Sequence, residues 1–453
     1  MEGVLQACIG ETVRISSLAV GSHCVGLVVQ LFVTEQQGLL VGGLLLNPEH
    51  RLGQGAGVRG CGRLATVMVG DYAMGSLLCP LGSSVFSCCA VPGGPVWSQA
   101  QGCWLIAAED LAAGIIDRQA VCEALGTGVL AVDSMIPIGR GQRELLVGDR
   151  GTGKTSLALD TLLNQRYSTL FAVYIPIGHK AQAVVTVALN LIARDAVFFV
   201  SCLEASASQS AVAQFVCAYA GSSLGEFYMH LGELPSFAVH DDLSRHAQGY
   251  REIYLLLGRR PGREAYPGEI FYVHSRLLER SAKLAFTCGG GSLTALPVVE
   301  TLAGDVAAYI STNVISITDG QLFLSADLFL SGQTPAIDVG NSVTRVGSAA
   351  QWPGMKQVAG STKVELAQYV ELQSFAQFAA DVGKATAHRM TQGRRLLELF
   401  KQRGGSPMTL HLEVAVLSLA NQDFFIRLQI TDVQPRVRWY LDLPVFAFLW
   451  RAL

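Results

Sequence analysis

Residues Gly148–Thr155 read Gly-Asp-Arg-Gly-Thr-Gly-Lys-Thr, and this stretch decides the fold of the chain. A glycine, four free positions and Gly-Lys-Thr form the pattern of a loop that binds phosphate groups. Arg143–Val147 before the loop is typical of a short strand, and Ser156–Leu163 after it has the apolar spacing of a helix. The alternative, a glycine-rich turn with a chance lysine, is disfavoured because both flanking elements are present.

The chemistry of phosphate binding predicts what this loop does. Its glycines let backbone N–H groups close around phosphate oxygens, and the helix N-terminus adds partial positive charge. Lys154 is expected to reach the β- and γ-phosphates of a nucleotide, and the Thr155 hydroxyl to hold Mg²⁺. The predicted binding residues of the loop are Gly148, Asp149, Arg150, Gly151, Thr152, Gly153, Lys154 and Thr155.

The composition bounds the class of protein. A chain of 453 residues is too long for one ordinary domain, so we expect two or three, and a hydrophobic fraction of 50% is ample for large cores. The charged fraction of 15% is low, which favours a surface partly covered by partners, with drift in composition as the simpler alternative. A net charge of −3 gives no support for a nucleic-acid-binding surface.

The spacing of the cysteines and the hydropathy of the chain indicate the kind of cellular compartment in which the protein works. The eleven cysteines are scattered apart from Cys88-Cys89 and have no zinc-binding spacing, so we expect buried thiols in a reducing compartment. The apolar stretch Leu18–Val33 falls short of the ~20 residues of a membrane-spanning helix. Met1–Val4 has no targeting character. We expect a protein that is soluble or held at a membrane only by partners.

Three domains are expected along the chain. Short runs such as Val25–Val33 and Gly38–Gly43 predict an N-terminal β-barrel over residues 1–70. Residues 71–350 are assigned to the nucleotide-binding domain, with a loop at Pro92–Pro95 and regular alternation of strands and helices from about residue 126. Residues 351–453 are expected to be helical, from the amphipathic spacing of Lys363–Phe378 and Ala385–Lys401.

Three apolar runs of the central domain predict strands of a parallel sheet: Leu170–Ile175, Val197–Ser201 and Phe237–Asp242. The third run ends in two carboxylates. An acid at the carboxyl end of such a strand can hold Mg²⁺ opposite a phosphate loop, and Asp241 is the predicted ligand. Asp242 fits better as the cap of a helix beginning at Leu243. The aromatic and basic runs Phe424–Arg427 and Arg436–Tyr440 receive no assignment.

Several long motifs, in matching order, resemble the α subunit of F-type ATP synthases. They are Pro137–Leu145, Arg259–Gly268, His274–Arg280, Gly289–Pro297 and Thr312–Gln321. The similarity is strong from about residue 126 to 402, weak before this range and nearly absent after Met408. Leu324–Phe329 resembles the chloroplast and cyanobacterial branch.

This resemblance implies an α/β RecA-like P-loop domain between an N-terminal β-barrel and a C-terminal helical domain. It implies three such chains alternating with three β subunits around a γ stalk, with δ and a peripheral stalk and with membrane contact only through the proton-translocating sector. The implied cofactors are ATP or ADP and Mg²⁺, with Phe329 and Gln402 in the nucleotide site. The implied location is the stromal side of the chloroplast thylakoid membrane, with a bacterial or mitochondrial inner membrane as alternatives.

The residue at position 179 bears on catalysis. Hydrolysis needs a carboxylate to activate water, and in β subunits it follows the strand after the phosphate-loop helix. The matching place in Ile177–Lys180 holds His179, where α subunits usually have glutamine. The chain's own site is therefore predicted to be non-catalytic, with His179 as a polar residue near the phosphates rather than a base.

Arg345 lies in Gly340–Gly347, where the family places its arginine finger. A guanidinium from a neighbouring subunit stabilises charge on the γ-phosphoryl oxygens in the transition state, so Arg345 is predicted to act on an adjacent β subunit. Ser316 and Thr344 are predicted to line the same cleft. The alternative is a surface or helix-start arginine.

Some positions depart from the family pattern. Gly151 and Gly404 stand where α subunits usually carry glutamine, and Thr334 stands before Pro335 where arginine is expected. These changes predict weaker or less selective nucleotide binding. We also expect the barrel to begin near Met1, without the helical extension that relatives use to bind the peripheral stalk.

Two other readings stay open. One is a self-sufficient RecA-like ATPase, including a helicase-type RNA motor, against which the net charge argues. The other is a degenerate paralogue with a structural role, against which the joint presence of Lys154, Thr155, Asp241 and Arg345 argues.

Overall fold

The computed structural model describes residues 8–16, 23–34, 38–46, 56–82, 84–87, 103–231, 235–376, 384–422, 424 and 429–441. The chain forms two compact units. The first unit contains Met1–Gln119, Thr169–Val299 and Ala307–Ile317, and the second contains Ala120–Ser168, Glu300–Val306 and Thr318–Leu453.

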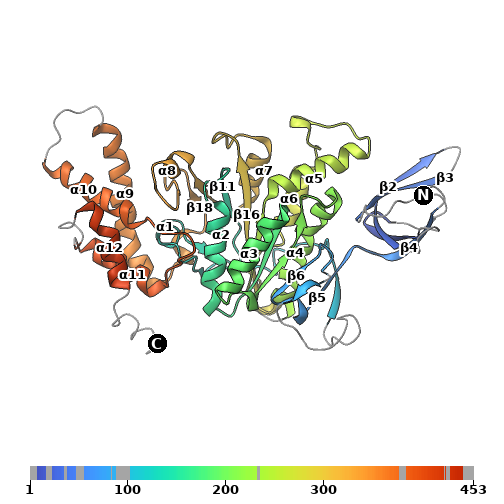
Figure 1. The fold of residues 1–453 in the computed structure, drawn as a ribbon, viewed down its shortest axis with the longest axis horizontal. Coiled ribbons are helices and arrows are strands. Elements are labelled where there is room, and N and C mark those ends of the chain that lie inside the picture. Colours follow the sequence, from blue (N-terminus) through green and yellow to red (C-terminus); the bar gives the residue numbers. More distant parts are fainter. Residues whose placement is uncertain are drawn as a thin grey trace. The chain divides into compact units, whose positions relative to one another are not determined.

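The N-terminal part of the first unit is an antiparallel sheet in the order β3-β2-β1-β4 (Figure 1). The strands are β1 (Glu11–Ser16), β2 (His23–Thr34), β3 (Gly38–Leu45) and β4 (Gly57–Leu64). Val13, Ile15 and Val28 pack together as its buried core. The strands predicted at Val25–Val33 and Gly38–Gly43 are confirmed. A second pair follows, in which β5 (Thr66–Gly70) is antiparallel to β8 (Cys103–Ala107).

A mainly parallel sheet forms the centre of the first unit, in the order β16-β15-β12-β13-β6-β7. Its strands are β16 (Ser292–Thr301), β15 (Pro235–Asp241), β12 (Phe171–His179), β13 (Val200–Leu203), β6 (Ser76–Leu78) and β7 (Ser84–Ser87), and the short β14 (Ala205–Ser206) also pairs with β12. Only the β6–β7 pair is antiparallel among these pairs. The continuous apolar runs at β12 and β15 follow from burial on both faces of a parallel sheet.

The α-helices in the described part of the first unit are α3 (Ala181–Ala193), α4 (Ala211–Leu231), α5 (Leu243–Leu256), α6 (Ile270–Leu278) and α7 (Tyr309–Ile317). The helix α4 packs against β12, β15 and α5. Gly221 permits this approach, because a Cβ there would clash with the side chain of Ile175 in β12.

A buried ion pair joins α4 to the segment after α6. Arg280 is 1% exposed, and its Nε donates to Oε1 of Glu226 at 2.8 Å. Its remaining nitrogens donate to the Ser223 hydroxyl and the carbonyl of Ala108, both at 2.8 Å. The guanidinium therefore ties three separate stretches of the first unit together.

The second unit contains the strands around the phosphate loop. The strand β11 (Glu144–Asp149) is parallel to β17 (Gly320–Leu324), which pairs antiparallel with β18 (Val343–Thr344). The short β9 (Ala124–Leu125) pairs with β10 (Ile138–Gly139). The accompanying helices are α1 (Leu130–Met135), α2 (Lys154–Asn164) and α8 (Ala326–Leu330).

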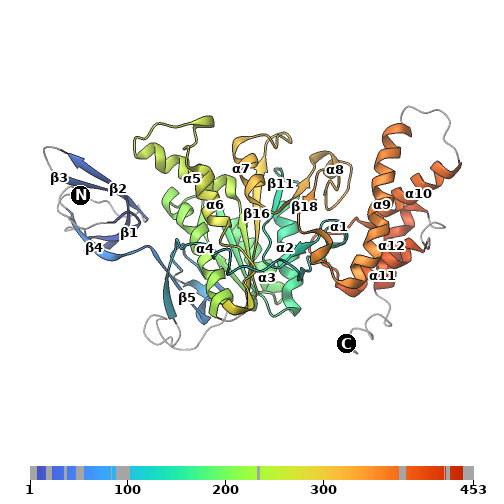
Figure 2. The same cartoon turned by 180° about the vertical axis from the view of Figure 1, so that it is seen from behind.

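Four helices form the C-terminal part of the second unit, and Figures 1 and 2 show them grouped together from opposite sides. They are α9 (Pro353–Ala376), α10 (Lys384–Leu399), α11 (Leu410–Asn421) and α12 (Ile430–Leu441). The helix α9 packs against α10 and α11, and α10 packs against α12. The predicted helical C-terminal part is confirmed, and the unassigned run Arg436–Tyr440 lies in α12.

One predicted strand is partly wrong. In Val197–Ser201 the first three residues form a 3₁₀-helix, and β13 begins only at Val200. Phe198 is 62% exposed, so its apolar character does not mark a buried strand position. The predicted loop at Pro92–Pro95 and most of Phe424–Arg427 lie outside the described residues. In the part of the chain that the structure describes, no helix has the length and apolar character to cross a membrane.

Three histidines are buried together in the first unit: His240 of β15, His246 of α5 and His274 of α6. The His246 ring stacks on Phe215 at 5.2 Å and lies 5.5 Å from the His274 ring, measured between centroids. Burial, with repulsion from the neighbouring imidazoles, lowers the pKa to about 3 for His240 and His274, and the Arg280 charge adds to the effect on His240. Burial lowers the pKa of His246 to about 4. All three are therefore neutral at pH 7.

This cluster should make the fold sensitive to acid. Below about pH 6.5 the unfolded chain takes up protons that the folded cluster refuses, so stability falls by up to about 1.4 kcal/mol per pH unit for each histidine until the folded-state pKa is reached. Replacing His246 by glutamine should reduce the loss of urea midpoint between pH 7 and pH 5. The exposed His411 supplies the control, His411→Gln. An unchanged pH response of His246→Gln would contradict the prediction.

Candidate functional site

The loop from Gly148 to Gly153 connects β11 to α2, as predicted. Gly151 and Gly153 have φ values of 81° and 100°, a left-handed conformation that side chains with a Cβ rarely adopt. A Cβ on Gly148 would lie 2.5 Å from the carbonyl oxygen of Leu324 in β17. The glycines are thus required by the backbone path of the loop.

Lys154 opens α2 and lies folded over the loop. Its Nζ donates to the carbonyls of Gly148 at 2.7 Å and Asp149 at 2.6 Å. The side chain is 8% exposed, so the ammonium is held by dipoles rather than by bulk water. Thr155, the second residue of α2, is half-buried. Both residues occupy the helix N-terminus, where partial positive charge favours an anion.

Three loop residues have contacts that the pattern alone does not predict. The Asp149 carboxylate accepts hydrogen bonds from the Thr301 hydroxyl at 2.7 Å and the Gly304 N–H at 2.8 Å, so it anchors the loop. Arg150 is 83% exposed, with its Nε 3.9 Å from the Glu300 carboxylate. Thr152 is buried and donates to the Asp149 carbonyl at 2.8 Å.

A pocket of about 150 Å³ lies beside the loop and α2. It brings the predicted residues Phe329 and Gln402 to the same place as Thr152 and Gly153. Its lining consists of Val129, Thr152, Gly153, Ser156, Leu157, Asp160, Phe329, Thr334, Pro335, Ala336, Gln402 and Gly404. The family departures Thr334 and Gly404 thus line this pocket. Its volume is below the ~300–1,000 Å³ of typical ligand pockets, so it suits only part of a nucleotide.

The Gln402 amide is engaged with the backbone. Its Nε2 donates to the carbonyls of Gly128 at 2.7 Å and Ser406 at 2.6 Å. Its Oε1 accepts from the N–H of Leu130 at 3.3 Å. Gln402 therefore shapes the wall of the pocket.

Asp241 and His179 meet in the first unit. Asp241 ends β15, is 2% exposed and accepts a hydrogen bond from the Tyr174 hydroxyl at 2.9 Å. His179 Nε2 lies 3.4 Å from Asp241 Oδ1, the distance of an ion pair rather than a short hydrogen bond. Interaction with the Asp241 carboxylate raises the pKa of His179, against the effect of burial. This arrangement favours the imidazolium, which cannot accept a proton from water.

Asp242 has the predicted capping role. Its Oδ1 accepts from the Ser244 N–H at 2.5 Å at the start of α5. The two adjacent carboxylates thus have different partners: Asp242 caps α5, whereas Asp241 accepts from Tyr174 and lies beside His179.

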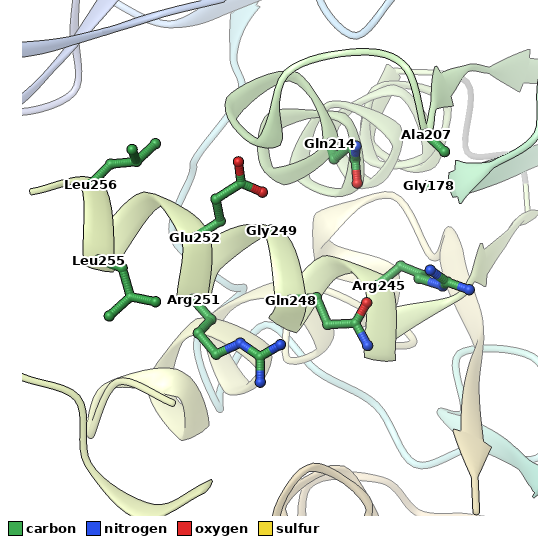
Figure 3. A pocket seen from close by; sticks show the side chains of 10 residues that line it. All are labelled: Gly178, Ala207, Gln214, Arg245, Gln248, Gly249, Arg251, Glu252, Leu255 and Leu256. Carbon is green, nitrogen blue, oxygen red and sulfur yellow. The ribbon is translucent and has the colours of Figure 1, made fainter. Parts of the chain in front are cut away.

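Sequence reasoning missed a cationic neighbour of this pair. A pocket of about 580 Å³ runs along α5, and Figure 3 shows Arg245 at the end where Gly178 lies. The Arg245 Cβ is 3.2 Å from where a Cβ on Gly178 would stand, and the Arg245 charge acts to lower the pKa of His179. The remaining lining is Ala207, Gln214, Gln248, Gly249, Arg251, Glu252, Leu255 and Leu256. No signal in the sequence pointed to Arg245, because its place beside His179 depends on the packing of α5.

Arg345 directly follows β18 and is exposed. Its N–H donates to the Asp319 carbonyl at 2.9 Å, and the Asp319 carboxylate is bound by Arg143 at 2.7 and 3.0 Å. Among the described residues, no carboxylate forms an ion pair with the Arg345 guanidinium. The backbone is thus anchored while the guanidinium faces outward.

The two residues predicted to lie beside Arg345 are placed differently. Thr344 precedes it in β18, and its hydroxyl accepts from Gln142 Nε2 at 3.0 Å. Ser316 belongs to α7 of the other compact unit, is exposed, and donates to the Asn313 carbonyl at 2.7 Å. Their assignment to a common cleft stays a prediction.

A strand, a glycine loop and a helix that begins with Lys154 and Thr155 define a P-loop nucleotide-binding protein with a RecA-like domain. Residues 128–344 match the ATP synthase alpha/beta family, nucleotide-binding domain, and residues 351–442 match the ATP synthase alpha/beta chain, C terminal domain. The chain belongs to the ATP synthase alpha/beta family. It is therefore a nucleotide-binding subunit of an ATPase or ATP synthase complex, and the predicted fold class is confirmed.

Replacing Lys154 by methionine is expected to weaken binding of ATP by about 10- to 100-fold, because a hydrogen bond to a charged group contributes about 1.5–3 kcal/mol. Equilibrium titration of the purified chain with a fluorescent ATP analogue measures this change. Lys356, exposed on α9, supplies the matched control Lys356→Met. If the Lys154→Met variant and the unchanged chain bind ATP with equal affinity, the loop is not part of the binding site.

Proposed function

We propose that this chain is the non-catalytic α-type subunit of a proton-translocating F-type ATP synthase. The observation that carries the proposal is that the end of β12 holds His179, with its Nε2 3.4 Å from Asp241 Oδ1, and no carboxylate of its own. A water-activating carboxylate is required at this place for hydrolysis. A protonated imidazole supplies positive charge for a bound phosphate instead of a base.

Nucleotide and metal binding follow from the residues present. Thr155, next to Lys154 at the start of α2, supplies a hydroxyl oxygen, a hard donor of the kind that Mg²⁺ prefers, and would hold the ion beside the phosphates. When bound, Mg²⁺ neutralises phosphate charge. Lys154 and the loop N–H groups bind the phosphates, while the altered lining at Thr334 and Gly404 supports weaker or less selective nucleotide binding than in other α subunits.

We infer that this subunit contributes to catalysis at the active site of a neighbouring subunit. Arg345, with an anchored backbone and an exposed guanidinium, supplies an arginine finger to the catalytic site of a β subunit. Three such chains alternate with three β subunits around a γ stalk, with δ and the peripheral stalk attached. The likeness of Leu324–Phe329 to the chloroplast branch supports a place on the stromal side of the thylakoid membrane.

The test compares ATP hydrolysis by the purified chain with hydrolysis by the assembly obtained under native conditions. We expect nucleotide binding without turnover by the chain alone, and turnover when β subunits are present. If the purified chain alone hydrolyses ATP, and its Lys154→Met variant does not, the chain is instead a self-sufficient ATPase. A chain that binds neither nucleotide nor β subunits would be a structural paralogue.

A further inference from the structure

Two carboxylic acids meet in the interior of the second unit, away from the phosphate loop. Asp133 of α1 is 4% exposed and Glu413 of α11 is 1% exposed. Each carboxyl group acts directly on the charge of the other. Two buried carboxylates in contact cannot both be ionised without strong repulsion, so the pair must hold a proton.

The surroundings decide which acid carries that proton. Asp133 is an acceptor for the Thr127 N–H at 3.0 Å, the Thr127 hydroxyl at 2.8 Å and the Gly128 N–H at 2.9 Å. Within the described part of the chain, neither oxygen of Glu413 meets a donor. Burial and the neighbouring Asp133 raise the pKa of Glu413 well above its usual value. The proton therefore belongs on Glu413, whose buried oxygens meet no donor, rather than on Asp133, whose carboxylate accepts hydrogen bonds from Thr127 and Gly128.

Nearby charges do not replace this proton. The helix α9 packs against both α1 and α11, and its Lys363 Nζ lies 3.4 Å from the carbonyl of Met135, which accepts its hydrogen bond. Gln351 Nε2 donates to the carbonyl of Asp133 at 3.0 Å rather than to its carboxylate. His411, on the same helix as Glu413, is exposed.

The turn held by Asp133, formed by Thr127 and Gly128, leads directly into the pocket beside the phosphate loop. Val129 lines that pocket. The Gly128 carbonyl accepts from Gln402 Nε2 at 2.7 Å and from the Met408 N–H at 2.8 Å. A Cβ on Gly128 would lie 2.6 Å from Pro407, so the turn and the segment 402–408 fit closely. Displacing the turn would displace Val129 and Gln402 together.

We propose that Glu413 and Asp133 are positioning residues for nucleotide binding. They share one proton, and the resulting pair, one neutral acid and one carboxylate, holds residues 127–130 against Gln402. A second negative charge in the pair would separate α11 from α1 and open the wall of the pocket. Nucleotide affinity therefore depends on the protonation of Glu413. This inference rests on the proposed nucleotide-binding function of the site.

The direction of the pH effect follows from the location of the proton. The folded chain holds the Glu413 proton to a higher pH than a free glutamate does, so affinity is retained at neutral pH. It should fall in the alkaline range as Glu413 ionises, by up to about tenfold per pH unit if binding requires the protonated form.

The experiment measures the affinity of the complete chain for ADP from pH 6 to pH 9.5. The unchanged chain should lose affinity as the pH rises. Glu413→Gln, which keeps a neutral hydrogen-bond donor, should retain affinity at pH 7 and lose the alkaline dependence. Glu371→Gln, at an exposed position on α9, is the matched control and should titrate like the unchanged chain. An identical pH profile for Glu413→Gln and the unchanged chain would overturn the proposal.

Infrared spectroscopy supplies a readout that does not depend on binding. At pH 8 the unchanged chain should show the C=O stretch of a protonated carboxylic acid that is missing in Glu413→Gln. If that variant does not fold, Asp133→Asn should shift the same band, because the neighbouring carboxylate is removed. An unshifted spectrum in both comparisons would overturn the proposal. Failure of all chains to bind ADP, with the band present, would instead contradict the proposed function and leave the shared proton established.

Discussion

Replacing Arg345 by alanine is expected to lower ATP turnover of the assembled complex by about 10³- to 10⁵-fold, the range over which arginine fingers act. The physical reason is the loss of a guanidinium that binds charge developing on the γ-phosphoryl oxygens of a neighbouring subunit. Nucleotide binding to this chain should be unchanged, because Arg345 does not line the pocket beside the phosphate loop. Steady-state hydrolysis and binding, measured on the same preparation, separate the two effects.

The backbone of Arg345 is held in place by its neighbours, which allows a second variant and a control to be compared. Its N–H is held by Asp319, which is itself held by Arg143, so the guanidinium is presented from a fixed base. Arg345→Lys keeps the charge but loses the planar fork, and should recover only part of the turnover. Arg166→Ala, at an exposed position after α2, is the control and should leave turnover intact. If an assembled complex with Arg345→Ala keeps full turnover, Arg345 is a surface residue without a role in catalysis.

Replacing Arg280 by methionine is expected to destabilise the first unit by about 3–5 kcal/mol. Such a change leaves the Glu226 carboxylate buried without its partner, which is the costly way to break an ion pair. Arg280 is 1% exposed and donates hydrogen bonds to Glu226, Ser223 and Ala108. Urea unfolding of the purified chain, followed by far-UV circular dichroism, measures the loss.

An exposed ion pair supplies the comparison. The Nε of Arg263 lies 3.9 Å from the Glu264 carboxylate, and their side chains are 66% and 45% exposed. Arg263→Met should cost no more than about 1 kcal/mol, because water already solvates both charges. The double change Arg280→Met with Glu226→Leu should restore much of the stability by removing both buried charges. Equal midpoints for Arg280→Met and Arg263→Met would refute the assigned role of the buried pair.

The phosphate loop could be predicted from the sequence because its geometry is local. The left-handed backbone at Gly151 and Gly153 and the close approach at Gly148 permit little but glycine, so the spacing itself encodes the turn. Asp241 could be placed at a strand end for a similar reason, since a buried parallel strand reads as a continuous apolar run.

Other features depend on contacts between residues distant in the sequence. Arg245 is charged and unremarkable in the sequence until α5 places it near His179. Val197–Ser201 is apolar enough for a strand, but its first half turns as a 3₁₀-helix after α3 ends. Asp133 and Glu413 lie far apart along the chain, and both are buried because α1 and α11 pack against the same helix, α9. No pattern within a short stretch of the sequence predicts these long-range contacts.

The amide of Gln402 has a consequence for the choice of base. Both hydrogens of its Nε2 are donated to backbone carbonyls and its oxygen accepts a backbone N–H, so this side chain has no hydrogen left to read the edge of a purine ring. Thr334 and Gly404 on the same wall offer at most a hydroxyl. If a base occupies this pocket, we expect adenine and guanine to be distinguished mainly by fit, so that the affinities for ATP and GTP differ little.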